Sequence, residues 1–291
     1  MKHLNQFITE YIIKKKLDKP IDSEDHYEYT PKTKNELIKN IKELFNNNIY
    51  DFNCIDTSKI TDMSELFNNY IFSTIVFDVS DWDVSNVKTM RNMFKKCEFF
   101  NCDLSKWDVS NVEDMTNMFY ECKYFTGKGL ENWDVSNVKY IARMFTNCGN
   151  FDCDLSNWNI HNVTSTYGLF WNCENFKGKG LENWDVSNVI NMDSMFSFCP
   201  KFNCNLSKWK VSNNTTDMGA MFRNCSKFDS DLSNWDVSNV RHMEEMFVNC
   251  SKFKGKGLEK WDVSNIEPAN MIGMFKNCKS LKRPSWYKEN T

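Results

Sequence analysis

Tryptophan recurs at a nearly constant interval along this chain of 291 residues, and that regularity restricts the fold more than any other feature. Successive spacings are 25 or 26 residues, and most of these tryptophans open the string Trp-Asp-Val-Ser-Asn. Such a period indicates stacked units, because one short unit cannot bury its own apolar edge. We therefore predict a repeat solenoid with a structural ladder of indoles, formed by Trp82, Trp107, Trp133, Trp158, Trp184, Trp209, Trp235 and Trp261. Each buried indole N–H is expected to donate to a carbonyl of the following turn.

The repeat unit contains two different apolar spacings. Trp107 and Val109 alternate with a polar residue, which is typical of a strand. Asn111 then marks a turn, and apolar residues such as Met115 and Met118 follow at intervals of three or four, which predicts a short helix. Together, the period and the pattern predict a leucine-rich-repeat-like solenoid with one short strand and one short helix in every turn.

The chain divides into three predicted regions. Residues 1–48 form an N-terminal helical segment and cap, residues 49–285 form about nine solenoid turns, and residues 286–291 form a tail. Apolar residues after Pro31 recur with helical spacing, and this helix is expected to cover the open end of the stack. Another helix is expected over residues 5–17.

Composition and charge argue against several classes of protein. With 36 basic and 39 acidic residues, the formal net charge of -3 gives no electrostatic indication of nucleic-acid binding. No apolar run approaches the roughly 18 residues of a membrane span, and the N-terminus does not have the pattern of a signal peptide. We therefore expect a cytoplasmic or virion-associated protein rather than one at the cell surface.

No pattern typical of catalysis or metal binding is visible. None of the four histidines pairs with a recurrent Ser or Cys, and Gly-Lys-Gly at 127–129 lacks the spacer and ending of a P-loop. The twelve cysteines follow the repeat, and pairs such as Cys97 and Cys102 recur every second turn, roughly 10 Å apart, so four thiolates do not converge. We expect free thiols, no metal, no cofactor and no enzymatic activity.

Polar residues that flank the tryptophans are the first candidate binding site. In the predicted strand they face solvent, and they form a mostly acidic stripe. The stripe consists of Asp83, Asp108, Asp134, Asn159, His161, Asp185, Lys210, Asp236 and Asp262. Two interpretations are open: a local hydrogen-bonding role for each aspartate in its turn, or a surface for a basic or cationic ligand.

Two turns depart from the repeat. Residues 209–234 contain Lys210 in place of Asp and an extra residue in Asn213-Asn-Thr-Thr. Residues 158–183 contain Asn159 in place of Asp, His161 in place of Ser, Thr166 in place of Met, and the additional Trp171. A partner-binding patch requires such breaks in symmetry, and sequence drift explains them equally well.

The string Trp-Asp-Val-Ser-Asn-Val-x-x-Met-x-x-Met-Phe-x-x-Cys resembles the repeat of BspA-type bacterial leucine-rich-repeat surface proteins, and the Mycoplasma-type branch is most similar. The resemblance covers about residues 51–283. It implies a right-handed solenoid that serves in adhesion or protein binding, without catalytic residues. Members are often surface-attached or lipid-anchored, and similar repeats occur in phage and large-virus genomes.

These observations predict a non-enzymatic module that binds a macromolecular partner along the strand face of the solenoid. The expected partner is a protein or, alternatively, a glycan, and the chain itself is expected to be a monomer. The alternative function is a structural component of a virion or surface layer that assembles through end or side contacts.

Overall fold

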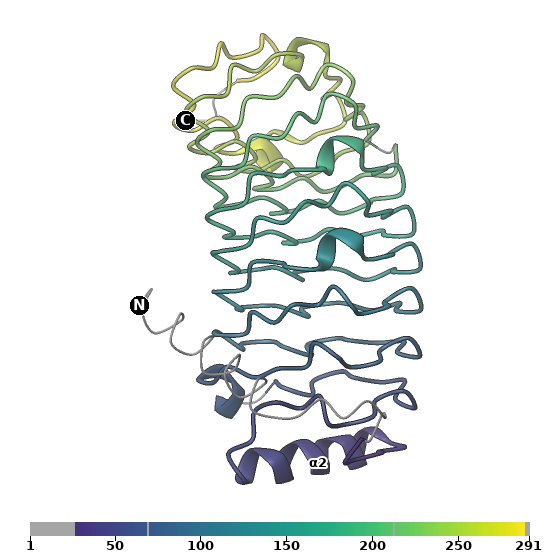
Figure 1. Cartoon of the computed structure of the whole chain (residues 1–291). Helices are drawn as coiled ribbons and strands as arrows, with labels where there is room; N and C mark the ends of the chain where they lie inside the picture. The colour runs from purple at the N-terminus through teal and green to yellow at the C-terminus, as the bar shows by residue number, and fades with distance from the viewer. Residues whose placement is uncertain (1–26, 69, 212, 289–291) are drawn as a thin grey trace.

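Successive repeats stack along one axis into a solenoid (Figure 1). The structure, a computed structural model, describes residues 27–68, 70–211 and 213–288. α2, Lys34–Asn46, lies across the N-terminal end of the stack, and the C-terminus lies at the opposite end (Figure 1). The predicted helix over residues 5–17 lies outside the described residues.

The helix predicted after Pro31 is present as α2. Thr33 provides its N-cap, accepting a hydrogen bond from the backbone N–H of Glu36 at 3.3 Å. Leu37, Ile41 and Leu44 are buried and belong to the same apolar core as the first solenoid turn. α2 therefore covers apolar surface that the first turn would otherwise expose at its open side.

The repeat units do not consist of a strand and a helix, and this prediction was wrong. Apart from α2, the helices of the described residues are short 3₁₀ turns: η1 Tyr70–Ser73, η2 Leu130–Asn132, η3 Leu181–Asn183, η4 Leu258–Lys260 and η5 Pro268–Met271. The Trp-Asp-Val segment carries no β-pairing in the described turns. Parallel pairing occurs instead at isolated bridges just before the methionines, for example from Asp114 to Thr89 and to Tyr140.

The segment predicted to be helical carries the backbone bonds between turns. Alternate N–H groups donate to the following turn at 2.8–3.0 Å: Met115, Asn117, Phe119 and Glu121 donate to the carbonyls of Tyr140, Ala142, Met144 and Thr146. The intervening N–H groups of Met118, Tyr120 and Cys122 close local turns by donating three residues back. We call residues 113–121 and their equivalents in the other turns the ladder segment, and their solvent side the ladder face.

Residues with a left-handed backbone explain why the apolar residues of this segment have the spacing of a helix. Asn117 and Glu121 have φ values of +54° and +61°, and each is the third residue of a local turn. These residues reverse the direction of the chain, so that Met115, Met118 and Cys122 point inward at intervals of three or four without any α-helix. Spacing alone cannot separate this arrangement from a helical face.

Columns of identical side chains fill the interior. Nine phenylalanine rings stack with centroids 5.5–5.8 Å apart, from Phe67 through Phe94, Phe119, Phe145, Phe170, Phe196, Phe222 and Phe247 to Phe275. The tryptophans form a parallel column, in which five pairs from neighbouring turns stack at 6.1–6.5 Å. Trp286, which was predicted to lie in the tail, stacks on Trp261 and so continues this column.

Each indole N–H of the tryptophan column donates to a carbonyl of the preceding turn, not of the following one as predicted. Trp184 Nε1 donates to the Leu155 carbonyl at 3.1 Å, and Trp209 Nε1 donates to the Leu181 carbonyl at 2.7 Å. The indole bonds tie each turn to the turn before it, and alternate amides of the ladder segment from Met115 onward tie it to the turn after it.

Replacement of Trp184 by Phe should lower the free energy of unfolding by about 1–3 kcal/mol, because the buried bond to Leu155 is lost and a void remains. Trp171→Phe is the matched control, since this half-buried indole has no hydrogen-bond acceptor among the described residues and its loss should stay within about 0.5 kcal/mol. Urea denaturation measures both values. Equal losses in the two variants would contradict the role assigned to the column.

Gly180→Ala should destabilise the protein by about 2–5 kcal/mol. Gly180 has a φ of +91°, and an added Cβ would lie 2.2 Å from the backbone nitrogen of Ser156 in the preceding turn. In Gly149→Ala the new Cβ would meet no heavy atom closer than 3.8 Å, so this control should unfold close to the wild-type midpoint. Thermal unfolding followed by circular dichroism compares the two, and a stable Gly180→Ala protein would refute the close approach of these turns.

Candidate functional site

The predicted acidic stripe lies in the loop after each tryptophan rather than on a strand. In each of six turns an aspartate Oδ1 accepts the N–H of the serine two residues later, at 2.9–3.0 Å. The aspartates are Asp83, Asp108, Asp134, Asp185, Asp236 and Asp262, and Asn159 bonds the His161 N–H in the same way at 3.1 Å. Lys210 is exposed and interrupts the stripe.

Hydrogen bonds stabilise the ionised form of four stripe carboxylates. Bonds from the following serine lower the pKa of Asp134, Asp236 and Asp262. In Asp185, bonds from Ser187 and then from His161, whose Nδ1 lies 3.0 Å from Oδ2, lower the pKa to about 2. Each carboxylate therefore has a local structural role, which corresponds to the first of the two interpretations. Whether the stripe also binds a ligand stays a prediction.

All twelve cysteines lie within the described residues, and none forms a disulfide. Eight of them form an inner column in which each thiol lies 2.8–3.4 Å from the carbonyl of a phenylalanine in the preceding turn. Burial raises the pKa of Cys199 and Cys204 to about 12. These thiols have the properties of core residues rather than nucleophiles. Within the described ranges, no group of three His, Cys, Asp or Glu side chains is placed to hold a metal ion.

The ladder face carries a cluster of aromatic side chains that the sequence analysis identified only in part. We call Tyr120, Arg143, Tyr167, Trp171 and Phe198 the aromatic patch. The Arg143 guanidinium lies 4.6 Å from the centre of the Tyr167 ring and donates to its hydroxyl at 2.8 Å. Trp171 packs edge-on against Phe198 with centroids 5.7 Å apart. All five side chains are at least partly exposed.

A hollow of about 330 Å³ opens between Tyr120, Arg143, Tyr167 and Trp171. Gly168 belongs to its lining because it has no side chain: an added Cβ would lie 3.2 Å from Cγ of Arg143. The patch residues come from four successive ladder segments and occupy outward positions. Sequence reasoning singled out Trp171 but missed Tyr120, Arg143 and Tyr167, because it assigned the outward face to the Trp-Asp-Val segment.

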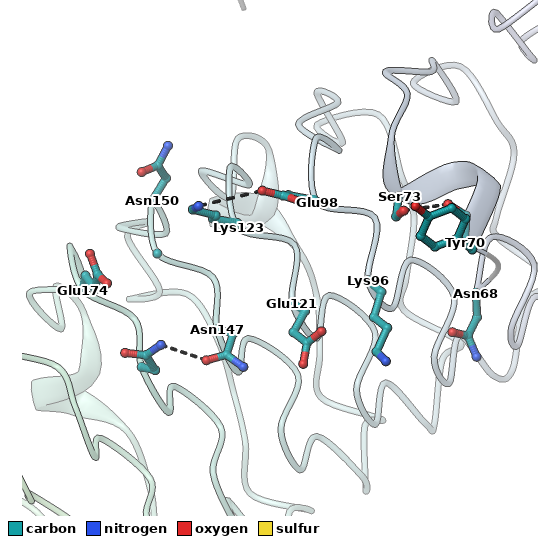
Figure 2. A pocket seen from close by; sticks show the side chains of 12 residues that line it. Asn68, Tyr70, Ser73, Lys96, Glu98, Glu121, Lys123, Asn147, Asn150 and Glu174 are labelled. Atoms are coloured by element: carbon teal, nitrogen blue, oxygen red, sulfur yellow. Dashed lines mark hydrogen bonds and ion pairs between the residues drawn. The ribbon is translucent and has the colours of Figure 1, made fainter. Parts of the chain in front are cut away.

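A second, larger depression of about 730 Å³ lies beside η1 on the next corner of the solenoid. Figure 2 shows its polar lining, in which Lys123 lies toward Glu98 and a dashed line marks a hydrogen bond at Asn147. The Lys123–Glu98 pair measures 3.8 Å, and Asn172 donates to Asn147 at 2.8 Å. Some of these polar groups pair with one another, and Tyr70 provides an aromatic side chain at the rim.

No helix among the described residues has the length and apolar character needed to cross a bilayer.

Comparison with known proteins places the chain in a family. No curated protein matches it. Among solved structures, a chain of the "Crystal structure of TLR13-ssRNA13 complex" is similar with 11% sequence identity and a TM-score of 0.26. The match covers 84% of this chain and 51% of that chain, so the present chain spans about half the length of that structure.

A family model matches almost the entire solenoid, in three overlapping segments at residues 35–129, 125–180 and 167–286. This match confirms the Mycoplasma-type resemblance of the repeat. The chain belongs to the family described as "Mycoplasma protein of unknown function, DUF285".

Proposed function

We propose that this chain is a non-enzymatic interaction module that binds a protein partner through the ladder face. The observation that carries the proposal is the aromatic patch, in which three partly exposed aromatic rings and an arginine surround one hollow. Tryptophan, tyrosine and arginine are the residues that most often dominate the binding energy of protein interfaces. The patch residues are not part of the core, which the phenylalanine and tryptophan columns fill, so their exposed surfaces can contact a partner.

The rigidity of the ladder segment favours binding. The Arg143 N–H donates to the Tyr167 carbonyl, and the Ala142 carbonyl accepts from Asn117, so neighbouring turns hold the backbone from both sides. The Tyr167 and Trp171 side chains are anchored on equally constrained backbone. Because the surface is already ordered, binding costs it little conformational entropy, which improves affinity for a given contact area.

The other two surfaces are weaker candidates for the main interface. The stripe carboxylates are exposed and bond a serine of their own turn through Oδ1, so they offer a partner polar contacts but little apolar area. The polar depression contains groups that pair with each other, as Lys123 does with Glu98. The aromatic patch presents apolar area whose burial stabilises a complex without loss of existing bonds.

Site-specific photocrosslinking in native cells tests this assignment. A benzophenone amino acid that replaces Tyr167 should yield one covalent adduct of defined mass, because Tyr167 lies inside the proposed interface. The same residue in place of Asp108, in the stripe, is the matched control and should yield little. Adducts of equal yield from both positions, or adducts from Asp108 alone, would exclude the ladder face as the main binding surface.

A further inference from the structure

Arg143 follows two turns that carry asparagine at the equivalent position, whereas later turns carry other residues there. The equivalent residues in the two preceding turns, Asn92 and Asn117, also have positive φ and are linked side chain to side chain. Asn117 Nδ2 donates to Asn92 Oδ1 at 3.0 Å, and Asn92 Nδ2 donates to Glu65 at 3.2 Å. Arg143 ends this series, since its guanidinium turns away toward Tyr167.

An arginine in place of a third consecutive asparagine has a cost in the folded state. Without a following asparagine, the buried Oδ1 atom of Asn117 has no hydrogen-bond partner in the described part of the chain. Arg143 itself has a φ of +56°, a conformation that asparagine tolerates better than a long side chain does. Local stability therefore favours asparagine at position 143, and a binding role accounts for the arginine.

The Arg143 guanidinium is oriented but has no ion-pair partner. It rests on the Tyr167 ring and is held by the Tyr167 hydroxyl, whereas no carboxylate of the described residues lies within 4.0 Å of it. Arg223, on the same face, differs in this respect because it pairs with Glu245. A positive charge that is held rigidly and left unpaired is suited to bind an incoming carboxylate through two parallel hydrogen bonds.

The hollow beside Arg143 adds a second requirement on a ligand. Tyr120, Tyr167 and Trp171 line it, and Gly168 keeps it open. Aromatic rings in such a lining favour another ring in an edge-to-face or offset arrangement. A ligand that satisfies both features carries a carboxylate and an aromatic side chain close together.

We propose that Arg143 anchors an aspartate or glutamate of the partner protein, and that an adjacent aromatic residue of the partner fills the hollow. The inference rests on the proposed function and specifies the chemistry of its partner: an extended acidic–aromatic segment. Charge complementarity with the unpaired guanidinium selects this occupant over a basic segment.

The binding test uses protein labelled with ¹⁵N only in arginine. The chain has five arginines, so the Nε–Hε spectrum contains few signals, and the Arg143→Gln variant assigns that of Arg143. The probes are the peptide acetyl-Gly-Glu-Phe-Gly-amide and its Gln counterpart. The Glu peptide should shift the Arg143 signal and leave Arg223 unchanged, and the Gln peptide should bind about tenfold more weakly. An unmoved Arg143 signal, or equal affinity for the two peptides, overturns the proposal.

The Arg143→Asn variant provides a second test that requires no partner. Asparagine restores the donor to Asn117 and fits the positive φ, so the variant should unfold about 2–4 °C above the wild type while it loses the preference for the Glu peptide. A lower unfolding temperature would show that Arg143 is kept for stability and would refute the argument from cost.

The two proposals fail in different ways. If the crosslink from Tyr167 forms with full yield in the Arg143→Asn protein, the ladder face remains the binding surface and the carboxylate anchor is wrong. If Arg143 responds to the Glu peptide but native cells give no crosslink from Tyr167, the anchor chemistry holds and the ladder face is not the native interface.

Discussion

The alternation of backbone hydrogen bonds along the ladder segment is the constraint on which the remaining structure depends. One amide closes a local turn and the next reaches the neighbouring repeat, as Met118 and Phe119 do. This alternation requires a left-handed residue twice in each repeat, and the positions are filled by asparagine in many turns. With left-handed residues at these positions, the methionine, phenylalanine and cysteine side chains point into the core. The period of 25 or 26 residues then brings each column into register.

Because the repeats are in register, substitutions are more restricted in the interior of the solenoid than on its exterior. An inward residue lies between its copies in two neighbouring turns, so a change at Phe145 disturbs the stacking with both Phe119 and Phe170. An outward residue of the ladder segment meets solvent and can vary from turn to turn. Tyr120, Tyr167 and Trp171 occupy such positions, and a binding surface can therefore arise without change to the core.

The sequence predicted the solenoid, the entry helix and the buried columns, because each depends on a period that can be read directly from the residues. The prediction of a helix failed because an α-helix and a series of local turns can place apolar residues at the same intervals in the sequence. Met115, Met118 and Cys122 are spaced as on a helix, and only the positive φ of Asn117 and Glu121 distinguishes the true conformation. The aspartate stripe follows separately from the spacing of Trp107 and Val109, and its aspartates lie in loops where they bond serines of their own turns. The asparagines directly before the cysteines of the column, such as Asn147 and Asn172, were the available signal, since asparagine tolerates a left-handed backbone.

Hydrogen-bond couplings measured by NMR on deuterated protein test the ladder most directly, because they connect a donor nitrogen to its acceptor carbonyl carbon. The ladder predicts a correlation from the amide of Asn117 to the carbonyl of Ala142 in the next turn, where the N···O distance is 3.0 Å. A correlation from Asn117 to the carbonyl of Glu113, four residues earlier, would instead show an α-helix and contradict the ladder.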